Sequence, residues 1–353
     1  MTDTPFRADA ALAPLKTFQR KTVDYVFRRL YEDEDSIRQF LVADEVGLGK
    51  TMVARGVIAR TIEHLWDRCD RIDILYICSN QAIASPNINR LNVLDRPDLA
   101  LPTRMTLVPL RLRGDKGLHA NKVNFISLTP GTTFDLRSAT GVQEERAFLL
   151  RLLEDAVSDR HGLFNLLQVY AGDDGWKGTV DTASIEGIDK ALIRRFRDDV
   201  QGNTELWAEL EALCRRFHRH RDTYPDDMVA ARNEVVGRLR TRLSHACVDA
   251  LQPDLIILDE FQRFADMLHG EHDAARLARE LFDYANAART LLLSATPYRM
   301  LTLSGDTPED GNHHADFLAT LGFLYGREQG KDIARVLELS LIHISEPTRQ
   351  RQP

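Results

Sequence analysis

Short runs of apolar residues recur along the chain and predict the strands of a sheet. The runs are often β-branched and mostly do not alternate with polar residues, which is the pattern of strands buried on both faces. Such strands belong to parallel sheets covered by helices, so the sequence predicts an α/β fold. The runs are Phe40–Ala43, Ile72–Cys78, Met105–Leu110, Val123–Leu128, Leu255–Leu258 and Thr290–Ser294.

Segments with apolar residues at helical spacing lie before and between these runs. The segment FQRKTVDYVFRRLY places Val23, Val26, Phe27 and Leu30 on one helical face. Between about Gly141 and Ala250 the chain is rich in Leu, Arg, Glu and Ala at helical spacing and has no strong strand run. We therefore expect a helical insertion over 141–250 between two parts of one α/β domain, residues 1–140 and 251–338.

Composition narrows the class of protein. The 353 residues are 43% hydrophobic, enough for one large domain or two ordinary ones. A net charge of −7 gives no global basic field, so any nucleic-acid binding needs a local surface. The four cysteines form no C-x-x-C pair, the N-terminus has no apolar signal region, and no apolar run approaches ~18 residues. We expect a cytoplasmic protein in a reducing compartment.

Residues 41–51 read LVADEVGLGKT and end in Gly-Lys-Thr, as a phosphate-binding loop does. The usual pattern is G-x-x-x-x-G-K-[ST], and here its first glycine is replaced by Asp44. An apolar run precedes the loop and a helical pattern follows it, which is the context such a loop requires. The alternative is a plain glycine-rich turn. The residues of this loop expected to bind the nucleotide are Asp44, Gly47, Leu48, Gly49, Lys50 and Thr51. The amides around Gly47–Thr51 would hold the phosphate oxygens, and Lys50 would neutralise their charge.

A second motif supplies carboxylates at the end of an apolar run. Residues 254–264 read DLIILDEFQRF, and we expect Asp259 to hold Mg²⁺ together with the Thr51 hydroxyl. Glu260 would activate the attacking water. The alternative is a solvated acidic turn. Further on, Ser294, Ala295 and Thr296 end another run and would couple to the acidic loop through hydrogen bonds, although a simple strand followed by a Thr-Pro turn is the alternative.

DEVGLGKT, DEFQ and SAT, in this order, resemble the first motor domain of superfamily 2 helicases and translocases, and most of all its Swi/Snf-like bacterial branch. In that branch an Asp-Glu pair commonly precedes Gly-x-Gly-Lys-Thr, so Asp44 is a mark of the class. The resemblance implies a RecA-like domain that uses ATP and Mg²⁺. It also implies that Gln19 reads adenine, that Gln262 joins Lys50 and Glu260 as a catalytic residue, and that nucleic acid contacts Ser79, Asn80, Thr129, Pro130 and Gly131.

The function expected from the motifs and the resemblance is the ATP-binding half of a helicase or translocase, with double-stranded DNA as the partner. The alternatives are a P-loop ATPase that acts as a nucleotide switch on protein partners, and a binding module with a vestigial site. The response of the ATPase to DNA separates the motor from the switch, because DNA would not stimulate a switch ATPase. We expect the basic stretches CRRFHRHR (214–221) and GRLRTR (237–242) to be solvated helix faces. The alternative is that they contact nucleic-acid phosphates.

The end of the chain carries a further expectation. Residues 339–349, LSLIHISEPTR, resemble a translated sequencing-library adapter, with a genuine polar tail as the alternative. We expect residues 339–353 to be a non-native tail and a second RecA-like domain to be missing in cis. The resemblance places ATP between two such domains, so the fragment alone is expected to be a poor ATP hydrolase.

Overall fold

The protein is described here by a computed structural model. The description covers residues 5–43, 47–78, 81–94, 100–102, 104–111, 121–129, 140–221, 223–248, 253–260 and 288–294.

A six-stranded sheet forms the centre of the α/β part, and every pair of neighbouring strands in it is parallel. The order is β1-β6-β5-β2-β4-β3, so strands far apart in sequence become neighbours. This confirms the predicted RecA-like α/β class, and five of the apolar runs are strands. The strands are β1 (Gln39–Ala43), β2 (Ile72–Ile77), β3 (Ala100–Pro102), β4 (Val123–Leu128), β5 (Leu255–Asp259) and β6 (Arg289–Ser294).

The sixth run, Met105–Leu110, was wrongly predicted to be a strand. It forms a 3₁₀ turn η3 (Met105–Leu107) followed by helix α5 (Val108–Arg111). Pro109 explains the difference, because proline gives no N–H to a strand ladder but is tolerated in the first turn of a helix. The strand that the sequence did not predict, β3, is short and lies at the edge of the sheet, where its own Pro102 is acceptable.

Side chains alternate between the two faces of the sheet and build two hydrophobic clusters. On β2, Ile72, Ile74 and Tyr76 belong to one cluster, and Leu75 and Ile77 belong to the other. The first cluster contains residues of the helices around the phosphate-loop segment. These are α1 (Asp9–Leu12), α2 (Thr17–Phe27) with its π-helical extension η1 (Arg28–Glu32), α3 (Lys50–Leu65) and α4 (Gln81–Leu91).

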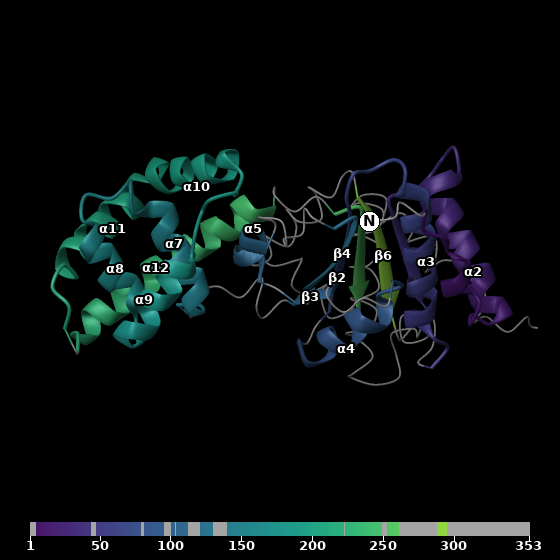
Figure 1. Ribbon diagram of the computed structural model, residues 1–353, viewed down its shortest axis with the longest axis horizontal. Coiled ribbons are helices and arrows are strands. Elements are labelled where there is room, and N and C mark those ends of the chain that lie inside the picture. Colours follow the sequence, from purple (N-terminus) through teal and green to yellow (C-terminus); the bar gives the residue numbers. More distant parts are fainter. Residues whose placement is uncertain are drawn as a thin grey trace, which may run out of the picture.

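The predicted amphipathic face of the N-terminal segment is confirmed, since Val23, Val26, Phe27 and Leu30 are all buried. Helices α2 and α3 lie next to each other at one side of the sheet (Figure 1). This arrangement places α2 beside the helix that follows the phosphate loop.

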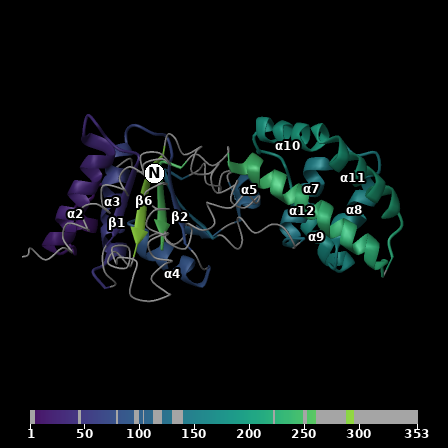
Figure 2. The ribbon, with the colours of Figure 1, turned by 180° about the vertical axis from the view of Figure 1, so that it is seen from behind.

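A body of helices lies between β4 and β5 in sequence and forms the predicted helical insertion. Figures 1 and 2 show it beside the sheet, with α5 and the C-terminal end of α12 between them. Asp159, Asp189 and Asn203 each cap a helix by accepting a backbone N–H. The helices of the insertion are α7 (Gln143–Leu153), α8 (Arg160–Gln168), α9 (Asp173–Thr182), α10 (Lys190–Gly202), α11 (Thr204–Arg216) and α12 (Asp226–Val248). The predicted boundary near 250 lies outside the described residues, so the division into domains stays a prediction.

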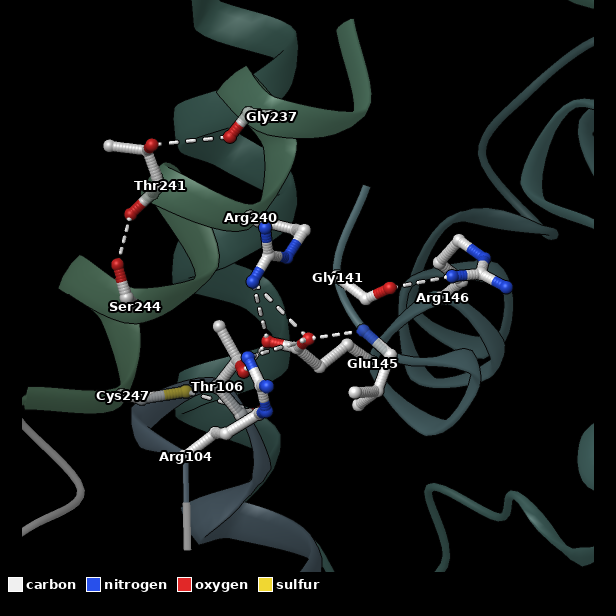
Figure 3. A network of polar contacts seen from close by, with 11 residues as sticks. Arg104, Thr106, Gly141, Glu145, Arg146, Gly237, Arg240, Thr241, Ser244 and Cys247 are labelled. Atoms are coloured by element: carbon white, nitrogen blue, oxygen red, sulfur yellow. Dashed lines mark hydrogen bonds and ion pairs between the residues drawn. The ribbon is translucent and has the colours of Figure 1, made fainter. Parts of the chain in front are cut away.

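A buried polar network joins the insertion to the segment that follows β3 (Figure 3). Glu145 of α7 is fully buried and accepts hydrogen bonds from the Thr106 hydroxyl at 2.6 Å and from Arg240 Nη2 at 3.0 Å. Arg104 lies 3.7 Å from the same carboxylate. Glu145 lies on α7 and Arg240 on α12, whereas Thr106 lies in η3 and Arg104 directly before it. The network therefore fixes the insertion to the segment that follows β3 in the sheet domain.

The basic stretches of the insertion have acidic partners within it. Arg238 pairs with Glu209 at 2.8 Å, and Arg242 pairs with Asp199 at 2.6 Å. Arg216 pairs with Asp227 at 2.7 Å. These pairs fit the expectation of a solvated, internally balanced surface at Arg216, Arg238 and Arg242. Arg240 of the same stretch was wrongly expected to be solvated, because its side chain is 1% exposed and pairs with the buried Glu145 at 3.0 Å.

The cysteines and the apolar content of the helices bear on the expectations from composition. All four cysteines are free thiols. Within the part of the chain that the structure describes, no helix is long and apolar enough to cross a membrane.

Candidate nucleotide-binding site

Three strands bring the predicted motifs to one edge of the sheet. The strand before the phosphate loop, β1, ends at Ala43, which pairs with Ser294 at the end of β6. On the other side of β6, Leu293 pairs with Asp259 at the end of β5. The ends of β1 and β5 are thus two strand spacings apart, about 10 Å. Open parallel sheets bind ligands at this carboxyl edge.

The turn between β1 and α3 depends on two glycines. Gly47 has a φ of +92° and Gly49 a φ of +85°, the left-handed region that residues with a Cβ rarely adopt. At Gly49 a Cβ would also lie 2.5 Å from the side-chain nitrogen of Gln19. The loop therefore has two separate reasons to require glycine at this position.

Gln19 of α2 is the support beneath this turn. Its side chain is buried; Nε2 donates to the Leu48 carbonyl at 2.9 Å, and Oε1 accepts the Lys16 N–H at 3.0 Å. The resemblance to superfamily 2 motors implies that Gln19 reads adenine, which stays a prediction. The structure places Gln19 against the turn that contains Leu48, where it holds the backbone of the predicted phosphate loop in position.

Helix α3 begins at Lys50, directly after the left-handed Gly49. The first amides of a helix have no intrahelical acceptor, and the helix dipole adds positive potential there. The first turn of α3 contains no acid, and Lys50 and Thr51 are its first two residues, both partly exposed. This end of the helix suits a phosphate group.

Asp259 and Glu260 follow one another at the end of β5, but their backbones differ. Asp259 is the last residue of the strand, whereas Glu260 has a φ of +56°. The Glu260 N–H donates to Asp259 Oδ1 at 3.0 Å. A left-handed conformation at a residue with a side chain is strained, and such strain concentrates at functional sites.

The other carboxylate oxygen of Asp259 has partners that the sequence did not suggest. Tyr76 Oη lies 2.7 Å from Asp259 Oδ2, and Asn87 Nδ2 lies 3.0 Å from Tyr76 Oη and 3.5 Å from the same Oδ2. Burial, and then the neighbouring Asp259 carboxylate, raise the pKa of Tyr76 well above its usual value, so the phenol stays protonated. The register of β2 against β5 brings Tyr76 to the end of β5, and α4 places Asn87 beside the Tyr76 hydroxyl.

The remaining predicted site residues fall into two groups. Ser294 is buried at the end of β6 between the two motifs, and Thr129 is buried directly after β4. A buried Thr129 offers little surface to nucleic acid. The predicted residues outside the described part of the chain are Asp44, Ser79, Asn80, Pro130, Gly131, Gln262, Ala295 and Thr296.

The residues present fit a magnesium-bound triphosphate. Among the described residues no group of three or more His, Cys, Asp or Glu side chains could hold a metal. A nucleotide-associated Mg²⁺ needs no such group, because it takes one or two protein oxygens and completes its shell with phosphates and water. The Thr51 hydroxyl and the Asp259 carboxylate supply that kind of donor. Asp259 Oδ1 accepts the Glu260 N–H and keeps lone-pair capacity for a metal-bound water.

Comparisons with known proteins found no match: no family model, no curated protein and no solved structure is similar to this chain.

Proposed function

We propose that this chain binds ATP with Mg²⁺ at the carboxyl edge of its sheet and hydrolyses it as part of a nucleic-acid-dependent motor, with double-stranded DNA as the partner. One observation carries the nucleotide part: the strand order places β6 between β1 and β5, so the phosphate loop and the Asp259–Glu260 pair share one edge. The DNA part is supported by the order of the three motifs and their resemblance to superfamily 2 motors.

The proposed roles follow from the chemistry of each group. The left-handed turn and the start of α3 present backbone N–H groups to phosphate oxygens, and Lys50 balances their negative charge. Thr51 and Asp259 would hold Mg²⁺, which screens the phosphates when it is bound. Glu260 would accept a proton from the attacking water. Gln19 supports the turn from below, so the phosphate loop is preorganised before the nucleotide arrives.

Nucleotide binding is the first test, because the resemblance implies that a second RecA-like domain is needed for full turnover. A fluorescent ATP analogue is titrated into the chain with Mg²⁺. Lys50→Ala should weaken binding at least about tenfold, since it removes a charge-assisted contact to phosphate. Lys21→Ala, an exposed lysine on α2, is the matched control and should bind like the wild type. Equal affinities for Lys50→Ala and Lys21→Ala would refute the assignment.

Hydrolysis and its response to DNA separate the motor from a nucleotide switch. Glu260→Gln should bind the analogue as tightly as the wild type and lose turnover, because the amide cannot accept the proton of water. Duplex DNA should raise the steady-state ATPase rate of the wild type. A rate that is measurable and indifferent to duplex DNA and to RNA would favour the switch.

A further inference from the structure

Asp259 is held on both of its oxygens, on one by its motif neighbour Glu260 and on the other by a residue outside the sequence motifs. Oδ1 accepts the N–H of Glu260 at 3.0 Å, and Oδ2 accepts the hydroxyl of Tyr76 at 2.7 Å. The last torsion of an aspartate side chain is broad and two-fold, so a carboxylate at a strand end is not oriented by its rotamer alone. Two donors on opposite oxygens fix the plane of the group.

Tyr76 is a rigid donor. Its side chain is fully buried on the β2 face that α3 and α4 cover, so the ring has one position. Asn87 Nδ2, 3.0 Å away, donates to the phenol oxygen and leaves the phenol proton for Asp259. The chain Asn87–Tyr76–Asp259 therefore runs in one donor direction and ends on the carboxylate.

Asn87 also connects the Asp259 carboxylate, through α4, to helix α3 of the predicted phosphate loop. It lies on α4, and α4 is fixed to α3 by Arg55, whose Nη1 donates to the Arg90 carbonyl at 2.6 Å and to the Asn92 carbonyl at 3.0 Å. Helix α3 starts at Lys50, so one set of contacts links both halves of the proposed nucleotide site.

We infer that Tyr76 and Asn87 are positioning residues that orient the Asp259 carboxylate for Mg²⁺ and connect it to α4. This inference rests on the proposed function. Neither side chain is proposed to touch the nucleotide phosphates, since each acts through Asp259. Their contribution must therefore appear in the dependence of nucleotide binding on the metal.

The test compares Tyr76→Phe with wild type in a Mg²⁺ titration. A fluorescent ADP analogue is bound at each Mg²⁺ concentration and also in EDTA. Removal of a hydrogen bond to a carboxylate should raise the Mg²⁺ concentration for half-maximal enhancement of binding by about tenfold. Affinity in EDTA should stay within about twofold of wild type. Asn87→Ala should shift the midpoint in the same direction and to a smaller extent, because the Tyr76 hydroxyl remains.

The control is Tyr25→Phe, which removes a hydroxyl from a half-exposed tyrosine on α2. It should leave the Mg²⁺ midpoint unchanged. The inference is overturned if Tyr76→Phe and Asn87→Ala both keep the wild-type midpoint, or if they weaken binding equally with and without Mg²⁺, as a general structural defect would. A wild-type chain that binds the nucleotide without any response to Mg²⁺ would instead overturn the proposed metal site itself.

Discussion

Glu260 shows at the scale of one residue how the site departs from ordinary backbone geometry. The sequence identifies Asp259 and Glu260 as an acidic pair, but nothing in the letters shows that Glu260 adopts a φ of +56°. In a continuing strand the two adjacent side chains would point to opposite faces of the sheet, and the left-handed backbone at Glu260 ends that alternation. A left-handed residue with a Cβ is held there at a cost of roughly 1–2 kcal/mol.

Glu260→Gly should therefore stabilise the protein and remove its activity. Glycine adopts the left-handed region without strain, so we expect the free energy of unfolding to rise by about 0.5–1 kcal/mol. Urea denaturation measures this change, and an ATPase assay measures the loss of turnover. Glu260→Ala is the control, because it removes the carboxylate and keeps the Cβ. Equal stability of the Gly and Ala variants would show that the residue is not strained.

The glycines of the phosphate loop were predictable from sequence, whereas the residues that support the site were not. Gly49 and Lys50 stand at fixed spacing in a known pattern, and Gly47 follows from the resemblance to Gly-x-Gly-Lys-Thr. Tyr76 and Asn87 carry no pattern, because their role depends on which strand lies beside β2. Gln19 was found by resemblance, but its contact with Leu48 depends on how α2 packs against the loop.

At the scale of elements, periodicity predicted the strands well and strand pairing not at all. Runs such as Val123–Leu128 are buried throughout, as expected for a parallel sheet. The order β1-β6-β5 brings together residues that are about two hundred positions apart, and local sequence contains no signal for that pairing. Met105–Leu110 was misread because an apolar run of that length fits a strand and a buried helical turn equally well.

The contact of α7 with η3 and α12 gives a prediction about stability. Glu145→Ala would leave Arg240, which is 1% exposed, without its carboxylate, and breaking a buried pair in this way typically costs about 3–5 kcal/mol. Urea denaturation of the variant measures the loss. The neighbouring Glu144, 59% exposed and 3.6 Å from Arg111, is the matched control.

Glu144→Ala should change the free energy of unfolding by less than about 1 kcal/mol, because exposed ion pairs contribute little. If both variants lost the same amount, the buried network would not be what holds the insertion to the sheet domain.

At the scale of the whole molecule, a helical insertion separates the Lys50 and Asp259 motifs in sequence, while the strand order brings both motifs to one edge of the sheet. The longest helix of the insertion, α12, ends at Val248, only a few residues before β5 begins at Leu255 and leads to Asp259. Composition and helical spacing predicted the insertion. Its attachment through the buried Glu145 could not be predicted, since a glutamate in a Leu- and Arg-rich helix reads as a surface residue.

The central claim is that the start of α3 and the end of β5 hold one magnesium-bound triphosphate between them. A crystal structure of the chain with a non-hydrolysable ATP analogue and Mn²⁺ in place of Mg²⁺ tests it most directly, because the anomalous signal of manganese locates the metal independently of the nucleotide. We expect triphosphate density at Lys50 and a manganese peak between Thr51 and Asp259. A nucleotide bound elsewhere, or a manganese peak that contacts neither Thr51 nor Asp259, would contradict it.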